Sequence, residues 1–152
     1  MKETAIGILK ITSSAFKNNE YIPEIYTCEG RNINPSINIE NIPPSAESLT
    51  IIVDDPDATK GEFTHWVAWN IQPKSAIEED TFPGGIEGLN DYDTPKYMGP
   101  CPPSGVHRYF FKVYALDAKL DIKITSKKAD LEKAMEGHVI AYGELIGLYK
   151  KK

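Results

Sequence analysis

One carboxylate and two histidines stand at the ends of three apolar, strand-like runs of this sequence. Asp55 follows the run LTIIV, His65 begins HWVAWNI, and His107 begins HRYFFKVYAL. Alternate side chains of a strand share one face, so each of the three polar residues belongs to the apolar stripe of its own strand. If the first two strands pair antiparallel, Asp55 and His65 meet at one end of a sheet. His107 and Tyr109 join them if the third strand runs parallel to the second.

The face assignments follow from the alternation of side chains. The expected stripes are Leu49, Ile51, Val53 and Asp55 on the first strand, His65, Val67, Trp69 and Ile71 on the second, and His107, Tyr109, Phe111 and Val113 on the third. A chance placement of polar residues at strand ends explains one such case more easily than three. We therefore expect a pocket at the rim of the core.

The chemistry of this group suits a small anion such as phosphate. Asp55 accepts hydrogen bonds and favours the protonated form of a neighbouring histidine. Two imidazole donors, the Tyr109 hydroxyl and nearby backbone N–H groups then match the oxygens of a phosphate. Because Asp55 repels an anion, we expect it to orient a histidine or to accept a proton from the ligand.

The segment GPCPPSG directly precedes His107. Its three prolines fix φ and remove backbone donors, which excludes a helix or an inner strand, and X-Pro bonds of this kind adopt the cis form more readily than other peptide bonds. We expect a stiff loop that forms one wall of a small binding site.

Two other kinds of site use the same residues. Two histidines and a carboxylate can bind a metal, but the chain has no HxH or HExxH spacing, so we expect neither metal nor cofactor. Cys101, His107 and Asp55 could act as nucleophile, base and orienting acid, although Cys101 lies between two prolines without a helix N-terminus to activate it. A hydrolase that uses His65 or His107 as general base therefore remains the alternative to a binding protein.

The bulk composition limits the class of protein. The chain has 152 residues, enough for one domain spanning 1–152, and a formal net charge of -5, which argues against a nucleic-acid surface. No apolar stretch reaches the roughly 20 residues of a membrane span. The N-terminus lacks a charged and then apolar leader, so we expect a cytoplasmic protein. In that compartment Cys28 and Cys101 are expected to be free thiols.

Strand signals dominate the chain. We expect one helix, capped by Thr125 or Ser126 and ended by Gly137, and a long connection over 81–98 that suggests function. Many short strands with one late helix predict a mainly β protein, an antiparallel β-sandwich of Greek-key type. The expected strands cover 5–13, 21–26 (as an edge strand or extended arm), 36–42, 49–53, 65–71, 107–116 and 138–149, the last with a second helix as the alternative.

Four motifs together resemble the phosphatidylethanolamine-binding protein family, in its bacterial and archaeal branch that is similar to Raf kinase inhibitor protein. They are YTCEG, DDPDA, FTHWVAWNI and GLNDYDTPKYMGPCPPSGVHRYFFKVYALD, and they occur in the family's order over nearly the whole chain. The resemblance implies a β-sandwich with a C-terminal helix. Two positions depart from the family pattern: Thr59 stands where proline usually follows DPDA, and Asp93 stands where glycine is usual.

The resemblance also implies a site and partners. It places an anion pocket at Asp55, His65, His107 and Tyr109, with Arg108 adjacent. Members bind phosphate-like groups, including phosphorylethanolamine, and some inhibit kinases or serine proteases; homodimers are expected by the same analogy. We therefore predict a non-enzymatic binding protein for a phosphate or phospholipid head group, with walls formed by Pro56, Asp57, Pro100, Cys101 and Pro102.

Overall fold

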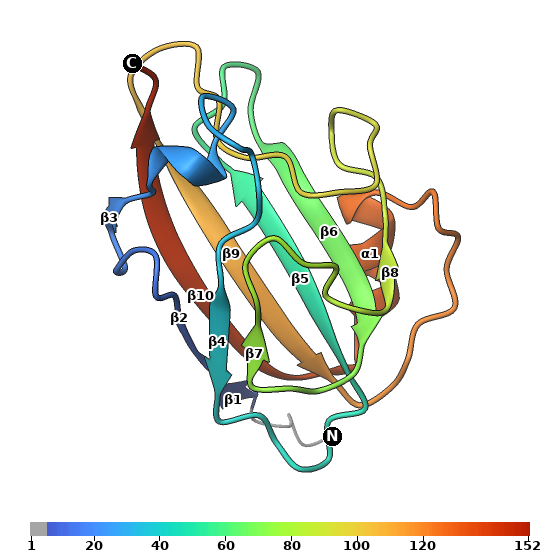
Figure 1. Cartoon of the computed structure of the whole chain (residues 1–152). Coiled ribbons are helices and arrows are strands. Elements are labelled where there is room, and N and C mark those ends of the chain that lie inside the picture. The colour runs from blue at the N-terminus through green and yellow to red at the C-terminus, as the bar shows by residue number, and fades with distance from the viewer. Residues whose placement is uncertain (1–5) are drawn as a thin grey trace.

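Two β-sheets and one helix make up the structure, a computed structural model that describes residues 6–152 (Figure 1). The large sheet has the strand order β1-β10-β9-β5-β6-β8, with β3 also paired to β10, and the small sheet has the order β2-β4-β7. The mainly β fold with one helix near the C-terminus is confirmed. The strands are β1 (Gly7–Ile8), β2 (Lys10–Thr12), β3 (Glu20–Tyr21), β4 (Ile37–Glu40), β5 (Ser48–Asp55), β6 (Phe63–Ile71), β7 (Ala76–Ile77), β8 (Ile86–Glu87), β9 (Val106–Leu116) and β10 (Val139–Lys150).

The large sheet separates two apolar layers. The main core lies between the two sheets and includes Ile39 from β4, Ile51 from β5 and Phe111 from β9. A smaller core lies on the opposite face, where Leu131 of helix α1 (Lys128–Met135) packs near Trp69 of β6. Figure 1 shows α1 behind the large sheet and the small sheet in front of it. Burial on both faces explains why β5 is a continuous apolar run.

Strand β5 determines which polar residues meet. It pairs antiparallel with β6 on one side and with β9 on the other, so β6 and β9 run in the same direction. The end of β5 at Asp55 therefore lies beside the starts of β6 and β9, which carry His65 and His107. This convergence is the arrangement expected from the sequence.

The expected stripe on β6 is wrong, because β6 contains two register shifts against β5. Val53 pairs with Trp66 and Asp54 with Thr64, which leaves His65 as an extra residue, and a second shift lies near Asn70. Trp66, Ala68 and Ile71 consequently face the main core, whereas Val67 and Trp69 face the helix. A bulge redirects the side chain that it carries. His65 reaches the ring of Tyr109 from this irregular position and not as part of a regular stripe.

The chain segments at the two ends differ in part from expectation. The expected strand over 5–13 splits into β1 on the large sheet and β2 on the small sheet, and its residue 5 lies outside the described residues. The segment 21–26 is not one strand: β3 is followed by a 3-10 turn over Glu24–Tyr26 that begins after Pro23. The last segment is strand β10, not a second helix. The β1 and β3 pairings with β10 are parallel, unlike the rest.

Helix α1 begins one to two residues later than expected. Its N-cap is Lys127, whose backbone N–H donates to Asp130 at 3.2 Å, so neither Thr125 nor Ser126 caps it. Gly137 follows the helix in a left-handed conformation, φ +79°, as expected for a helix end. Lys128 ties the helix to the large sheet, because its ammonium donates to buried Asp54 at 2.6 Å and contacts Glu62.

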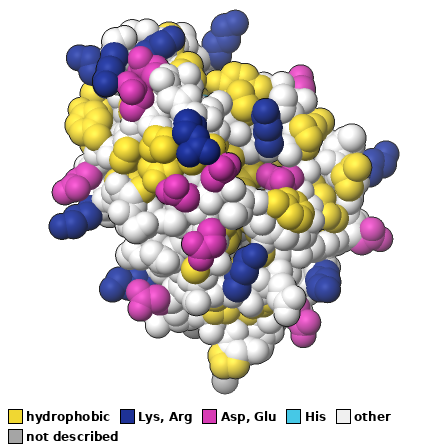
Figure 2. All heavy atoms as spheres, in the orientation of Figure 1, with side chains coloured by type: hydrophobic (Ala, Val, Ile, Leu, Met, Phe, Trp, Pro, Cys, Tyr) yellow, Lys and Arg dark blue, Asp and Glu magenta, His cyan; other side chains and the backbone are white. Residues whose placement is uncertain are grey.

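The surface carries both signs of charge. Figure 2 shows Lys and Arg side chains interspersed with Asp and Glu over the face seen in Figure 1, without a continuous basic stripe on that face. Within residues 6–152, α1 is the only α-helix, and at eight residues it is far too short to cross a bilayer.

Candidate ligand-binding site

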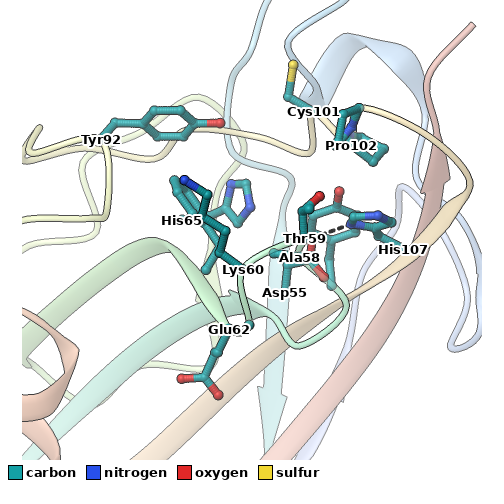
Figure 3. A pocket seen from close by; sticks show the side chains of 14 residues that line it. Asp55, Ala58, Thr59, Lys60, Glu62, His65, Tyr92, Cys101, Pro102 and His107 are labelled. Carbon is teal, nitrogen blue, oxygen red and sulfur yellow. Dashed lines mark hydrogen bonds and ion pairs between the residues drawn. The ribbon is translucent and has the colours of Figure 1, made fainter.

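A cavity of about 310 Å³ opens at the end of the large sheet where β5, β6 and β9 converge. Six of the ten residues predicted for the site line it: Asp55, His65, Cys101, Pro102, His107 and Tyr109. The cavity is therefore built from all three strand ends and from the proline loop. Figure 3 shows the Asp55–His107 pair on one side, His65 on another, and Pro102 above the pair.

The first polar element of the cavity is a buried, hydrogen-bonded pair, Asp55 and His107. Nδ1 of His107 lies 2.6 Å from Oδ2 of Asp55, and both side chains are at least nine-tenths buried. A carboxylate only accepts, so Nδ1 carries the proton and Nε2 is the nitrogen left for a ligand. The other oxygen of Asp55 accepts the backbone N–H of Asp57 at 2.7 Å. Asp55 thus orients His107 and has both oxygens engaged.

His65 has a different kind of partner. Its Nδ1 lies 2.7 Å from the carbonyl oxygen of Met98, and because a carbonyl only accepts, Nδ1 must donate. Burial lowers the pKa of His65 below its ordinary value, although the carboxylate of Asp55 acts in the opposite direction. His65 is therefore neutral at pH 7, and its Nε2 is a hydrogen-bond acceptor. In this tautomer His65 offers a ligand an acceptor, in place of the second imidazole donor expected from the sequence.

Tyr109 lies between the two histidines. Its ring centroid is 5.4 Å from that of His65 and 6.4 Å from that of His107. Its hydroxyl is buried and has no hydrogen-bond partner among residues 6–152; the backbone amide of Cys101 only approaches it. Burial raises the pKa of Tyr109 far above neutrality, so the hydroxyl keeps its proton. A buried donor without a partner is rare, and here it belongs to a residue that lines the cavity.

The proline wall is held by a disulfide bond, which corrects the expectation of free thiols. Cys28 and Cys101 are bonded, with their Cα atoms 5.5 Å apart. The expectation rested on compartment alone, and a separation of 73 residues hides that the fold brings the two together. The backbone N–H of Cys28 also donates to Pro100 at 3.1 Å. All peptide bonds of the described residues, those of the proline loop included, are trans.

Four predicted residues do not line the cavity. Pro56 is exposed and borders a separate groove, and Pro100 is buried behind the wall. Asp57 and Arg108 bind each other outside: the guanidinium of Arg108 donates to both oxygens of Asp57 at 2.9 and 3.0 Å. These hydrogen bonds keep the pKa of the Asp57 carboxyl below its ordinary value. The pair fastens the loop after β5 to the start of β9.

The connection over 81–98 supplies residues that the sequence analysis did not single out. Tyr92 lines the cavity, and Figure 3 shows its hydroxyl directed over the opening. Asn90 is fully buried and makes five hydrogen bonds, to His65, Tyr92, Thr94 and Lys96. The run NDYDT could have indicated this loop from the sequence. Asn and Asp side chains in such a run accept hydrogen bonds from the backbone two residues further on and so favour a turn.

Aromatic residues border the cavity together with one lysine, Lys60, and one glutamate, Glu62. Phe63 and Tyr92 are in edge contact, with ring centroids 4.8 Å apart, and Phe63 also contacts His65. Lys60 and Thr59 line the cavity from the loop after β5, and Figure 3 shows Lys60 extending towards the His65 side. Asp93, where the family usually has glycine, adopts a left-handed φ of +59°. That conformation explains why glycine suits the position.

We expect stability to fall between pH 7.5 and 5.5 because of His65. The unfolded chain binds a proton near the ordinary histidine pKa of about 6.5, whereas folded His65 does so only at lower pH. The folded state therefore binds fewer protons in this range, and its stability is lost as the pH falls. Thermal unfolding at stepped pH measures the slope, and His65→Gln should flatten it. An equal slope in both proteins would show that His65 is not the cause.

Comparisons with known proteins agree with this structure. The family model described as phosphatidylethanolamine-binding protein matches residues 12–150. A UPF0098 protein of Pyrococcus horikoshii is 55% identical over 150 residues, covering 92% of this chain and 76% of that protein. A UPF0098 protein of Methanothermobacter thermautotrophicus is 46% identical over 150 residues, covering 94% of this chain and 99% of that protein.

Solved structures show the same fold. A putative phosphatidylethanolamine-binding protein homologue from Chlamydia trachomatis superposes with a TM-score of 0.92 at 38% identity, covering 96% of this chain and 99% of that one. YbcL of Escherichia coli, described as a new member of the mammalian family, gives a TM-score of 0.87 at 30% identity, covering 95% and 99%. The chain belongs to the phosphatidylethanolamine-binding protein family.

Proposed function

We infer that this protein binds a small phosphate-bearing anion in the cavity at the ends of β5, β6 and β9. The observation that carries the proposal is the buried, unpartnered hydroxyl of Tyr109, whose ring packs near the imidazoles of His65 and His107. A donor in this position is stabilised once a ligand oxygen accepts from it. The cavity volume of about 310 Å³ lies at the lower end of the range for small-molecule sites.

The groups around the ligand have different roles in binding it. Tyr109 donates its hydroxyl, and His107 turns Nε2 to the ligand while Asp55 holds its Nδ1. The charge of Asp55 is already engaged by His107 and by the backbone N–H of Asp57, which reduces its repulsion of an anion. Hydrogen bonds to the ionised oxygens of a phosphate are charge-assisted and therefore strong. The aromatic residues of the rim, Phe63 and Tyr92, then contact the organic part of the ligand.

A hydrolase gains no support from this geometry. The nucleophile considered from the sequence, the thiol of Cys101, is bonded to Cys28. His107 is held by a carboxylate and His65 by a carbonyl, an arrangement that suits fixed binding groups equally well. We therefore favour a binding protein over a hydrolase. Inhibition of a kinase or protease, homodimer formation and a cytoplasmic location stay predictions from the resemblance and the sequence.

Replacing His107 by alanine should weaken the binding of inorganic phosphate and O-phosphoethanolamine by about 10- to 100-fold. The variant loses a hydrogen bond to a charged ligand, and such hydrogen bonds contribute about 1.5–3 kcal/mol. Isothermal titration calorimetry at pH 6.5 measures the loss. His138→Ala is the matched control, because His138 also pairs with an aspartate, Asp117 at 2.8 Å, but on the exposed surface. Unchanged affinity in the His107 variant would contradict the proposed function.

A further inference from the structure

The outward side of β9 and β10 carries apolar side chains that belong to neither core. Phe110 of β9 and Ile146 and Leu148 of β10 are partly exposed, and none of them joins the two apolar layers formed by residues 6–152. Their neighbours Phe111 and Leu145 face the main core, so alternation turns these three outward. Figure 1 shows α1 behind the β6 side of the large sheet, away from β10. We call this surface, which neither α1 nor the small sheet covers, the β9–β10 face.

The flanking strands extend the β9–β10 face. Tyr21 of β3 pairs with Leu148, and Ile8 of β1 pairs with Tyr142, so both side chains share the outward side of β10. Tyr21 is 57% exposed, Ile8 is 80% exposed, and Val106 at the start of β9 is 46% exposed. Three of the seven exposed large apolar side chains of residues 6–152 thus lie on one face. A contiguous exposed apolar patch of this kind marks an interaction surface.

Two charges lie on the same face, one on each side of its apolar centre. Glu144 and Lys150 are exposed residues of β10, and neither has an ion-pair partner among residues 6–152; Glu144 only accepts from the hydroxyl of Tyr142 at 2.6 Å. Ile146 and Leu148 lie between them on the outward side. The two charges are about 20 Å apart along the strand, so they cannot pair within one chain.

A second copy of the chain can bring these charges together. Two sheets that stack face to face lie about 10 Å apart, and a two-fold axis can run along the strands or across them. An axis along the strands places Lys150 over Lys150. An axis across the strands near Gly147 instead places Lys150 of one copy over Glu144 of the other, and Ile146 over Leu148. Only the second arrangement is complementary in charge.

The surface beside Glu144 is hollowed where that lysine would arrive. A groove of about 230 Å³ is lined by Glu144, Tyr142, Phe110 and Lys112, among others. Lys112 donates to the buried carboxylate of Asp54 at 2.9 Å and does not pair with Glu144. An ammonium group that enters the groove from a second copy can therefore pair with Glu144 and contact the rings of Tyr142 and Phe110.

The size of the β9–β10 face suits a small dimer. β10 has 12 residues and is flanked by β9 on one side and by β1 and β3 on the other, so the face measures about 40 Å by about 15 Å. Two such faces bury about 1,200 Å² in total, which is the lower end of the range for specific interfaces. The area is sufficient for a dimer that dissociates on dilution.

We propose that two copies of this chain form a two-fold dimer through their β9–β10 faces, with Lys150 of each copy paired to Glu144 of the other. The inference goes beyond the proposed function, because the anion cavity is not part of the contact. It also goes beyond the expectation of a homodimer from the resemblance, which named no surface.

Charge reversal at the two exposed positions tests this pairing. Sedimentation velocity over a concentration series of the full-length oxidised chain should show an equilibrium between monomer and dimer. Glu144→Lys places two lysines opposite each other at both symmetric contacts, and should raise the Kd of the dimer at least about tenfold. Lys150→Glu should do the same with two glutamates. Glu40→Lys is the matched control, because Glu40 is exposed on the small sheet and its reversal should leave the Kd unchanged.

Two rescue experiments identify the geometry of the dimer. The double variant with both reversals should dimerise like wild type. A mixture of the two single variants should form a heterodimer more tightly than either forms a homodimer, because each of its two contacts again joins a lysine to a glutamate. Rescue within one chain is excluded, since Glu144 and Lys150 are about 20 Å apart on the strand.

Leu148→Asp probes the apolar centre and should leave only monomer. A wild-type chain that stays monomeric at every concentration overturns the inference, and so does a dimer whose Kd neither charge reversal changes. A monomer that co-sediments with anionic phospholipid vesicles, and loses this binding in Leu148→Asp, also overturns it, because the face would then contact lipid. Each of these results leaves the proposed anion binding unaffected, since the phosphate titrations measure it separately.

Discussion

Replacing Asn90 by alanine should lower the free energy of unfolding by about 3–5 kcal/mol. The side chain is fully buried, and its amide donates to the carbonyls of His65 and Lys96 while its oxygen accepts from Tyr92 and Thr94. Alanine removes all five hydrogen bonds and leaves buried backbone groups without partners. Urea unfolding followed by tryptophan fluorescence measures the change.

The same variant should lose anion affinity, because the loop that Asn90 shapes carries Tyr92 and leads to Met98, the partner of His65. Asn18→Ala is a suitable control: its side chain is exposed and accepts a single hydrogen bond from Ile146. A stability loss for the Asn90 variant no larger than that of the control would show that the loop is held by other contacts.

Breaking the disulfide bond should cost about 2–4 kcal/mol of stability. The bond joins residues 73 positions apart, so in the oxidised chain it restricts a long loop of the unfolded state. Cys28→Ser is the appropriate variant, because Cys28 is exposed and outside the cavity whereas Cys101 lines it. Thermal unfolding of wild type and variant without reductant measures the difference.

Dithiothreitol provides the control for this prediction. It should lower the melting temperature of wild type to that of Cys28→Ser and leave the variant unchanged. The segment before Cys101 should stay in place in either case, since Gly99 donates to Asn32 and Tyr97 donates to Tyr26 without the disulfide. A wild-type protein that melts at one temperature with and without reductant would contradict a stabilising disulfide.

The convergence of the site was predictable because it depends only on strand period and direction. In β9 the inward and outward residues alternate without interruption, so Tyr109 and Phe111 face the core as the sequence indicates. The parallel directions of β6 and β9 follow from the single strand β5 between them. The face of each β9 residue and the directions of the strands depend only on local pattern and on topology. The alternation of apolar residues in the sequence therefore predicts them directly.

The rest of the site depends on features that the two-residue period of the strands does not predict. The bulge at His65 reverses the faces of Val67 and Trp69, and its cause lies in the pairing with β5 and not in β6 alone. The tautomer of His65 depends on a carbonyl 33 residues away, that of Met98. The disulfide depends in the same way on a long-range approach of two loops. The spacing of residues along the sequence does not predict any of these long-range contacts.

The mutual pairing of Arg108 and Asp57 has a consequence for how a ligand arrives. Arg108 follows His107 directly, yet its guanidinium is bound by a carboxylate, so the pair presents almost no net field to the solvent. An approaching anion meets a chain of net charge -5. Long-range attraction therefore contributes little to encounter, and beyond a Debye length of about 8 Å it is screened in any case. We therefore expect binding to depend on short-range contacts, which form only after the anion has entered the cavity.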